Sequence, residues 1–203
     1  MTVRDRKRVR TRRALVDAAT ELFGRQGYER TTIAEIADAA DVGARTFFSY
    51  FESKEELLFP DHEARVRAAL ECVERRGPDE RPAEVLLRAI AEIDGSEDLG
   101  GGLAALRLQL MREVPAVLAR GLQLCCRAQL EVARGLAAAF PDELDEVTAA
   151  ALTGAFAGAS VQSTIHLLLT APGLDAVAHR DAVRKATRAA LAPWLAPATV
   201  TGS

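Results

Sequence analysis

Glycine and proline residues divide this sequence into segments of helix length, within which apolar residues recur at helical spacing. The segments are rich in Ala, Leu, Arg and Glu and poor in β-branched runs, which is the composition typical of helices. The first is expected to run from about Val9 to Gln26 and to end at Gly27, a residue type that commonly terminates helices. A fourth, long helix is expected to begin after Ser53 and to run to about Arg76. Segments of this length and period predict an all-α protein with about nine helices.

Composition places the chain among folded proteins and excludes several classes. Of the 203 residues, 49% are apolar, which is enough to bury a core. No run approaches the roughly 18 to 20 uncharged apolar residues that span a bilayer, and the N-terminus has no secretory signal, so we expect a cytoplasmic protein without a membrane partner. The cysteines Cys72, Cys125 and Cys126 lack Cys-x-x-Cys spacing, so no disulfide, metal site or cofactor is expected.

Charge is distributed unevenly along the chain. Residues 1–54 carry eleven Lys and Arg against eight Asp and Glu, a net charge of +3, whereas the remainder carries −6. This asymmetry indicates a basic face with an anionic partner. Basic residues are densest near the N-terminus, at Arg4, Arg6, Lys7, Arg8, Arg10, Arg12 and Arg13. We expect them to form an arm that enters a minor groove or adds nonspecific affinity; the alternative is a solvated tail.

Two capping-box sequences frame the centre of the N-terminal segment. Thr32-x-x-Glu35 and Ser53-x-x-Glu56 each pair a hydroxyl that caps a helix N-terminus with a glutamate that bonds back. Between them the pattern predicts two short helices joined by a tight turn at residues 41–43. This is the layout of a helix-turn-helix, whose second helix can enter the major groove, although helical hairpins also occur as ordinary packing units.

The central residues also follow a family signature. Residues 31–58 read TTIAEIADAADVGARTFFSYFESKEELL: a hydroxyl-rich start, an IA..A helix, a turn, a T-aromatic-aromatic helix and YF.SKE.L, in that order. Residues 14–32, ALVDAATELFGRQGYERTT, supply a preceding helix with a Gly-aromatic exit. Together they resemble the TetR family of transcriptional regulators. The resemblance implies a three-helix, helix-turn-helix DNA-binding domain with a basic arm at residues 1–54, and a helical ligand-binding and dimerisation domain at residues 55–203.

The helix expected at residues 44–51 is the recognition helix that this resemblance implies. We expect Phe47, Phe48 and Phe51, with Ala44, to form an apolar stripe that packs as core. The groove-facing candidates lie away from that stripe, at Arg45, Thr46, Ser49 and Tyr50. An arginine can bond guanine bidentately, whereas hydroxyls hold phosphates or contact thymine methyl groups. Three further residues are expected at phosphates: Thr31, Thr32 and Lys54.

The match departs from the family pattern in the turn and in the recognition helix. Where the family commonly has Gly, Ser and Gly, this chain has Asp41, Gly43 and Arg45. Gly43 can still cap the helix, less well than Ser. Where the family often has a phosphate-binding Tyr, this chain has Phe48, which lacks the hydroxyl. We expect Arg45 and the basic arm to offset the lost contact with charge.

The resemblance also implies that the last two long helices form a four-helix interface between two subunits. In residues 143–171, a 4-3-4 spacing places small and branched residues on one side, at Gly154, Gly158, Val161 and Ile165. The final helix is expected to add Val183, Thr187, Ala190, Leu191 and Trp194 to the same seam. The alternative is a contact of these residues within one chain.

A cavity for a small molecule is expected beyond the helix-turn-helix. Such sites are lined mainly by apolar side chains with a few polar groups. The candidates are Leu106, Arg107, Met111, Leu122, Cys125, Gln129, Phe156, Ser160 and Ser163. The alternative for each of them is plain core. The stretches RTFF and SKEELLF are similar to those of regulators linked to fatty-acyl or other lipophilic effectors, which favours an apolar effector.

These observations and the resemblance predict a ligand-responsive transcriptional regulator rather than an enzyme. It would bind a near-palindromic site in double-stranded DNA as a homodimer, act as a repressor and be released by a small lipophilic effector. The alternative is an all-helical small-molecule-binding protein with only nonspecific DNA affinity. No nucleophile-elbow, phosphate-loop or metal-helix motif is present, which leaves a thiol–imidazole pair of Cys125 and His166 as the catalytic alternative.

Overall fold

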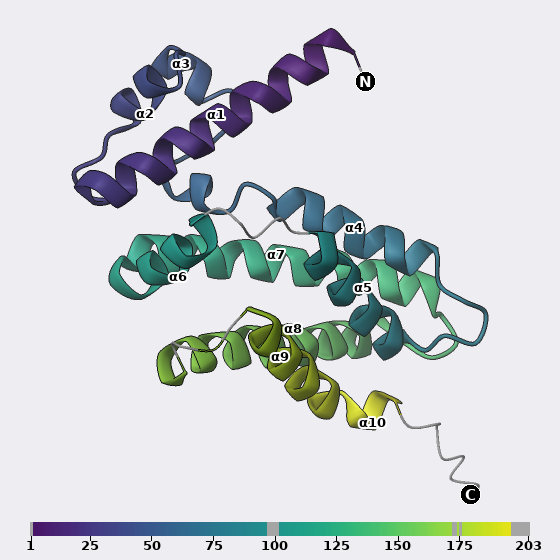
Figure 1. Cartoon of the computed structure of the whole chain (residues 1–203). Helices are drawn as coiled ribbons and strands as arrows, with labels where there is room; N and C mark the ends of the chain where they lie inside the picture. Colours follow the sequence, from purple (N-terminus) through teal and green to yellow (C-terminus); the bar gives the residue numbers. More distant parts are fainter. Residues whose placement is uncertain (1, 97–101, 172–173, 175, 196–203) are drawn as a thin grey trace, which may run out of the picture. The chain divides into compact units, whose positions relative to one another are not determined.

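A computed structural model describes residues 2–96, 102–171, 174 and 176–195. Within these residues the chain forms ten α-helices and one 3-10 helix and no strand, which confirms the all-α class (Figure 1). None of the helices in the described part is long and apolar enough to cross a bilayer. The elements are α1 (Val3–Gln26), α2 (Ile33–Ala39), α3 (Ala44–Phe47), η1 (Glu55–Leu58), α4 (His62–Glu74), α5 (Pro82–Ser96), α6 (Leu103–Glu113), α7 (Pro115–Ala139), α8 (Glu146–Thr170), α9 (Ala176–Ala190) and α10 (Ala192–Leu195).

The first helix begins earlier than predicted. α1 starts at Val3 because Thr2 and Asp5 form a capping box, in which the Asp5 carboxylate accepts from the Thr2 N–H at 2.8 Å. The same hydrogen bonds lower the pKa of Asp5. The basic residues expected to form an arm are therefore part of a helix. α1 ends, as predicted, where Gly27 takes a φ of 87° that favours glycine.

The two predicted capping boxes have different outcomes. At α2, the Thr32 hydroxyl accepts from the Glu35 N–H at 3.2 Å and the Glu35 carboxylate accepts from the Thr32 N–H at 2.8 Å, which confirms the first box. The second box is wrong: the Glu56 carboxylate accepts from the Glu52 N–H at 2.6 Å instead, ahead of the short η1 helix.

The long helix expected after Ser53 is also divided. Pro60 lies between η1 and α4, and a proline inside a helix removes an N–H donor and clashes with the preceding turn. The chain therefore leaves η1 at Phe59 and starts α4 only at His62. This division, together with the short α10, accounts for the difference from the predicted helix count among the described residues.

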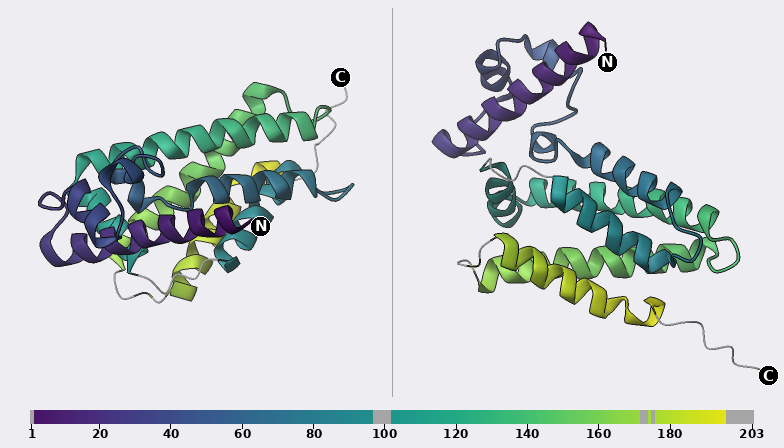
Figure 2. Two further views of the ribbon diagram at one scale, coloured as in Figure 1. Left: turned by 90° about the horizontal axis from the view of Figure 1, so that it is seen from above. Right: turned by 45° about the vertical axis from the view of Figure 1, so that its right-hand side comes forward.

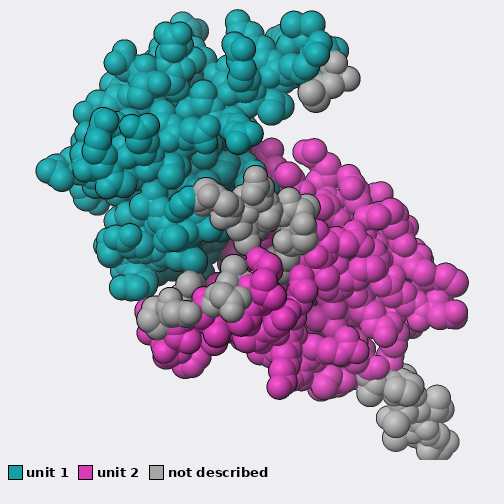
Figure 3. Space-filling model, in the orientation of Figure 1, with its two compact units in different colours: residues 1–62, 98–123 teal, residues 63–97, 124–203 magenta. Residues whose placement is uncertain are grey.

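The chain divides into two compact units that do not coincide with the predicted domains at residues 1–54 and 55–203. Unit 1 contains residues 1–62 and 98–123, and unit 2 contains residues 63–97 and 124–203 (Figure 3). α7 contributes its first turns to unit 1 and the remainder to unit 2. The helix-turn-helix thus shares a unit with α6 rather than forming one alone.

The core of unit 1 joins α1, α2, α3 and η1 to α6. Its fully buried side chains include Leu15, Ile36, Phe47 and Leu58, and α2 and α3 lie beside α1 (Figure 1). Three buried residues between the last turn of α6 and the first turn of α7 belong to the same cluster: Leu110, Val114 and Val117. Burial of each such aliphatic side chain contributes roughly 1.5–3 kcal/mol, so α6 is an integral part of the core that supports α3.

The core of unit 2 is built around α5, α7 and α8. It buries Val85, Leu136, Leu152 and Leu191, and α8 and α9 lie side by side in each view (Figures 1 and 2). At Gly135 an added Cβ would be 2.9 Å from a methyl carbon of Leu70, so glycine lets α7 approach α4 closely.

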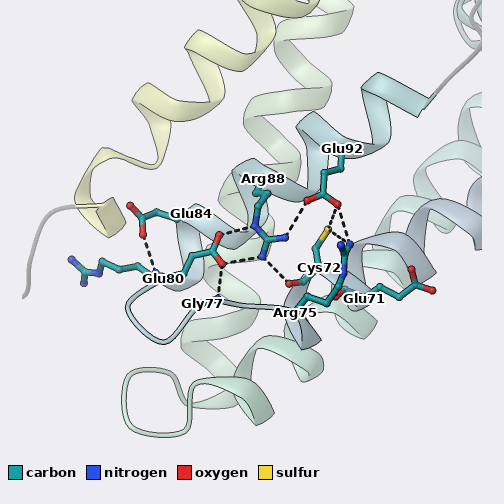
Figure 4. Close-up of polar contacts among 9 residues, drawn as sticks. Glu71, Cys72, Arg75, Gly77, Glu80, Glu84, Arg88 and Glu92 are labelled. Carbon is teal, nitrogen blue, oxygen red and sulfur yellow. Dashed lines mark hydrogen bonds and ion pairs between the residues drawn. The ribbon is translucent and has the colours of Figure 1, made fainter.

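A polar cluster holds the corner between α4 and α5 (Figure 4). The Arg88 guanidinium bonds Glu80 through Nε at 2.8 Å and through Nη2 at 2.9 Å, and the same Nη2 donates to the Cys72 carbonyl at 2.9 Å near the end of α4. Glu92 accepts from Arg88 at 3.2 Å and from Arg75 at 3.0 Å. The Cys72 side chain is buried and bonds Glu92, so it is a structural thiol whose pKa is raised by burial.

Candidate nucleic-acid interface

The turn between α2 and α3 sets the direction of the recognition segment. Asp41 has a φ of 54°, a left-handed conformation that Asp tolerates better than most residues. This explains how the chain forms the turn without the glycine that the family commonly has there. The next N–H, of Val42, donates to the Ala37 carbonyl at 2.9 Å. Gly43, with an ordinary φ of −75°, caps α3 without a side-chain bond.

The recognition segment is helical over fewer residues than the predicted 44–51. α3 ends at Phe47, and the chain continues as a turn in which the Ser49 N–H bonds the Thr46 carbonyl and the Tyr50 N–H bonds the Phe47 carbonyl. The Phe51 N–H also bonds Phe47, at 3.1 Å, so the segment keeps its helical direction up to Phe51. We call residues 44–51 the recognition segment.

One side of the recognition segment is anchored in the core of unit 1. Phe47 is 0% exposed and Phe51 is 2% exposed, as predicted from their spacing. The prediction that Phe48 is core is wrong, because its side chain is 58% exposed. In a helix of 3.6 residues per turn, Phe48 lies about 100° around the axis from Phe47, so burying Phe47 does not require burying its neighbour.

The opposite side of the segment carries the groove-facing candidates. Arg45 and Ser49 are exposed, and the Ser49 hydroxyl donates to the Thr46 carbonyl at 2.6 Å. Thr46 is half-buried. Tyr50 is also half-buried and packs against the core, with the Arg8 guanidinium 6.0 Å from its ring centre. The exposed residues of the segment are therefore Ala44, Arg45, Phe48 and Ser49, with Thr46 and Tyr50 at the border of this face. The prediction that Ala44 packs as core is thus wrong as well.

Arg12 connects α1 to the end of the recognition segment. Its guanidinium donates to the Tyr50 carbonyl at 3.0 Å and to the Pro60 carbonyl at 2.9 Å, and lies 4.3 Å from the Phe51 ring centre. Sequence reasoning grouped Arg12 with the basic arm and missed this role. No sequence signal could have found it, because main-chain carbonyls accept regardless of side-chain identity.

Two of the residues predicted at phosphates have structural roles in the fold. Thr31 is 1% exposed and its hydroxyl donates to the Gly27 carbonyl at 2.8 Å, so the prediction that it contacts DNA is wrong. The Lys54 ammonium donates to the carbonyls of Tyr28 and Thr31, at 2.8 and 3.0 Å, and lies 4.0 Å from the Tyr28 ring centre. Two of its three N–H donors are thus used within unit 1. Thr32 is exposed at the N-terminus of α2, where a phosphate contact remains a prediction.

A buried tyrosine ties the exit of α1 to the residues after the recognition segment. Tyr28 is 5% exposed and its hydroxyl donates to the Glu55 carboxylate. Burial and then this hydrogen bond raise the pKa of Tyr28 far above its usual value. Burial opposes ionisation of Glu55, but hydrogen bonds from Ser53 and Tyr28 outweigh it and lower the pKa of Glu55. The negative charge of Glu55 is therefore held inside unit 1 beside Lys54.

The predicted ligand residues divide between the two units. In unit 1, Leu106 and Met111 pack against the core, Arg107 donates to the Leu58 carbonyl at 3.4 Å, and Leu122 is 50% exposed. The remaining predicted residues belong to unit 2: Cys125, Gln129, Phe156, Ser160 and Ser163.

Three of these polar side chains in unit 2 have hydrogen-bond partners within the unit. Gln129 donates to the Cys125 sulfur at 3.1 Å, and the Ser160 hydroxyl bonds the Phe156 carbonyl and the Thr187 hydroxyl. The catalytic alternative gains no support, because in the described part of the chain the Cys125 sulfur accepts a hydrogen bond from Gln129 and bonds no histidine.

Two hollows within the units are lined by other residues. One of about 300 Å3 in unit 1 lies between residues 26–30 and the end of α6, at Leu110, Glu113 and Val114. One of about 370 Å3 in unit 2 lies between residues 76–81 and 139–143. Neither is lined by a predicted ligand residue, so the ligand residues remain a prediction.

The predicted dimer seam is in part internal to unit 2. Val183, Thr187 and Leu191 are 7%, 0% and 0% exposed in the single chain, so their assignment to a subunit interface is wrong. They are buried because α9 packs along α8. Of the α8 residues, Gly154, Val161 and Ile165 are half-buried, whereas Gly158 is exposed. The Ala190 side chain is exposed and that of Trp194 is half-buried.

A different side of α8 is exposed. Exposed residues recur there at helical spacing, at Val147, Ala151, Ala155, Gly158, Gln162, His166 and Leu169. We call these seven residues the α8 outer face. Two of its members are large apolar side chains with high exposure, Val147 at 78% and Leu169 at 55%.

The fold and this geometry define a class of protein: a helix-turn-helix packed on a first helix, followed by a larger all-helical region. Comparison with known proteins agrees. The family described as Bacterial regulatory proteins, tetR family, matches residues 15–59. HTH-type transcriptional regulator TcmR of Streptomyces glaucescens is 36% identical over 150 residues, which make up 71% of this chain and 66%, just under two thirds, of TcmR. The N-terminal region of this chain, residues 15–59, belongs to the TetR family of bacterial regulatory proteins.

Two solved structures share the fold over nearly the whole chain. FadR of Thermus thermophilus, a TetR-family transcriptional repressor in complex with lauroyl-CoA, has a TM-score of 0.59 and 22% identity, covering 95% of this chain and 99% of that chain. A TetR-family regulator from Syntrophomonas wolfei has a TM-score of 0.62 and 14% identity, covering 94% and 98%. At these identities the two structures show the shared fold alone.

Proposed function

We propose that this chain is a sequence-specific DNA-binding repressor that acts as a homodimer and is released by a small apolar effector. The observation that carries the DNA-binding part is the exposed face of the recognition segment. Phe47 and Phe51 anchor one side of the segment, while Arg45 and Ser49 are exposed on the other. A fork of N–H donors on a rigid helix is suited to the O6 and N7 acceptors of guanine in the major groove.

The first turns of α1 supply positive charge for the phosphates. Exposed cations follow one another there, at Arg4, Arg6, Lys7, Arg8 and Arg10. Arg12 bonds the Tyr50 carbonyl, which ties this cationic stretch of helix to the recognition segment. Phosphate contacts of this kind add affinity without reading sequence and make it depend on salt. In a homodimer, two recognition segments about 34 to 36 Å apart would reach successive major grooves of a near-palindrome.

The shared core of unit 1 supports control by a ligand. Leu110 and Val117, from α6 and α7, belong to the cluster that holds Phe47. Arg120 of α7 also bonds Glu52 at 3.0 Å and Glu56 at 3.3 Å, directly after the recognition segment. A movement of α6 or the start of α7 would therefore disturb the support of the recognition segment. An effector changes DNA affinity only by binding the two resulting shapes differently.

Selection of genomic DNA fragments by the purified protein tests this proposal. We expect a small set of fragments with a common near-palindromic motif to be retained at about 150 mM salt, because base contacts supplement the salt-sensitive phosphate contacts. Replacing Arg45 by Ala should lower affinity for the selected motif roughly tenfold or more and relax the preference at one base pair per half-site. Arg134→Ala, which removes the same charge from an exposed position on α7, is the matched control and should bind as the parent does.

Three further results decide the parts of the proposal. If all fragments are retained alike and the Arg45→Ala and Arg134→Ala proteins bind DNA with equal affinity, binding is nonspecific and the alternative function holds. Transcription in vitro from a promoter that contains the motif should fall when protein is added; a rise would make it an activator. When apolar small molecules are added singly to the protein–DNA complex, we expect at least one of them to release the DNA. If the DNA stays bound in the presence of each of them, the result would count against an apolar effector.

A further inference from the structure

We propose that Phe48 reads a thymine in the operator through contact of its ring with the thymine C5-methyl group. The inference rests on the proposed DNA-binding function and adds a specificity-determining residue to it. It starts from the exposed position of Phe48, which sequence reasoning had placed in the core. At 58% exposed, Phe48 is the most exposed aromatic side chain among the described residues.

The Phe48 ring is exposed yet held in place. It stands nearly perpendicular to Phe47, at an interplanar angle of 83° and a centre-to-centre distance of 5.3 Å. Phe47 is itself 0% exposed, so Phe48 packs against a ring that the core of unit 1 holds in place. An edge-to-face pair of this kind is stabilising and limits the rotamers of the outer ring. Contact with DNA would then cost less side-chain entropy than it would for a free side chain.

Phe48 lies beside the residue proposed to read a base. Arg45 precedes it by three residues, and side chains three residues apart are neighbours on one face of a helix. Ser49 completes the exposed face, and its hydroxyl already donates to the Thr46 carbonyl. A guanidinium and an apolar ring are thus presented together on the exposed side of the recognition segment.

The chemistry of a phenyl ring narrows what it can recognise. It has no donor or acceptor, so it can bond neither a phosphate nor the polar edge of a base. In the major groove of unmodified DNA, the thymine methyl group is the apolar feature that distinguishes one base pair from the others, and aromatic and aliphatic side chains contact it. The half-site should therefore contain a thymine within a few base pairs of the guanine bonded by Arg45.

Deoxyuridine substitution tests the contact, because it removes the thymine methyl group and leaves base pairing intact. In the operator obtained by genomic selection, each thymine is replaced singly and the dissociation constant is measured. For the parent protein we expect one position per half-site at which deoxyuridine weakens binding roughly three- to fivefold, as expected for one methyl group no longer buried. The Phe48→Ala protein should bind the thymine and deoxyuridine operators equally at that position.

Two variants separate base reading from a structural role. Phe48→Leu keeps an apolar side chain and should still prefer thymine over deoxyuridine at the same position, whereas Phe48→Ser should not. Because Phe48 is largely exposed, its replacement leaves no buried cavity, and unchanged thermal unfolding of all three variants checks this.

The opposite outcomes are distinct. If Phe48→Ala weakens binding equally on thymine and deoxyuridine operators and the parent's deoxyuridine loss persists, Phe48 supports its neighbours and does not read thymine. The same conclusion follows if deoxyuridine at each thymine position leaves the affinity of the parent protein unchanged. A selection that yields no operator contradicts the proposed function, and the inference with it. An operator whose affinity for the parent protein is unchanged by deoxyuridine contradicts the inference alone.

Discussion

Arg12 shows how one residue in a charged run differs from its neighbours. Its neighbour Arg13 is solvated, with 84% of the side chain exposed and a single ion pair to Asp17 at 3.8 Å. Arg12 instead donates to two main-chain carbonyls, those of Tyr50 and Pro60, and covers the Phe51 ring. These two carbonyls lie outside the helices, so their hydrogen-bond donors must come from elsewhere. The Arg12 guanidinium supplies donors that would otherwise have to come from water.

Replacement of Arg12 by Ala should destabilise the protein and weaken DNA binding together. Hydrogen bonds to a charged group contribute about 1.5–3 kcal/mol, so we expect the free energy of unfolding to fall by about 2 kcal/mol. Arg13→Ala, which removes the same charge but only a surface ion pair, should change it by less than about 0.5 kcal/mol. Urea unfolding at pH 7 measures the free energy of unfolding of both variants. Equal effects of the two substitutions would show that the carbonyl contacts of Arg12 add nothing.

At the scale of elements, the corner between α4 and α5 depends on ionised carboxylates. Hydrogen bonds from Arg88, with a further one from the Gly77 N–H, lower the pKa of Glu80 below its usual value near 4.5. Bonds from Cys72, Arg88 and Arg75 lower the pKa of Glu92 in the same way. A carboxylate whose pKa is lower in the folded state stabilises the fold above its unfolded pKa, and this stabilisation is lost as pH falls through the folded value.

Acid should therefore weaken unit 2 through this corner. We expect the free energy of unfolding of the parent to fall as pH is lowered from about 5 to 3, and to fall less in Glu80→Gln, which has no carboxylate to protonate at that position. Glu74→Gln is the control, since Glu74 is the exposed last residue of α4. Urea unfolding across this pH range measures the slopes. Parallel slopes for the parent and Glu80→Gln would exclude a role for Glu80 in the acid response.

At the scale of the whole molecule, the proposed homodimer requires a surface on unit 2 that the single chain leaves open. The α8 outer face meets this requirement: small residues at Ala151, Ala155 and Gly158 would let another helix approach closely. An added Cβ at Gly158 would meet nothing within 4 Å in the single chain. Any penalty for a larger side chain there must therefore come from a partner molecule.

Gly158→Leu should lower the molecular mass measured by light scattering from that of a dimer towards that of a monomer. The subunit should stay folded, because Leu has a higher helix propensity than Gly and meets no neighbour in the chain. Gly24→Leu is the control: its Cβ also meets nothing within 4 Å, but it lies on α1. If the Gly158→Leu protein keeps the mass of the parent, the subunit interface lies elsewhere.

Much of the fold could be predicted because local patterns specify it. Thr32 and Glu35 form their capping box with each other, so three residues of spacing suffice to predict the start of α2. Phe47 and Phe51 are both buried, because residues four apart share a helical face. Where the prediction failed, a competing local rule was overlooked: Pro60 interrupts the helix expected after Ser53, and the Thr2 cap extends α1 over the basic residues.

The sequence by itself determined the all-helical class, the order of the helices and the helix-turn-helix, since caps, breakers and apolar spacing act within a few residues of one another. Only the tertiary structure decided the state of the site residues. Thr31 and Phe48 both sit in the region expected to meet DNA, yet one is buried and the other is 58% exposed. Likewise, Val183 and Gly158 are predicted on the same dimer seam. Packing of α9 on α8 buries Val183 and leaves Gly158 exposed. The physical reason is that burial depends on which distant helix covers a face, and periodicity identifies a face without identifying its partner.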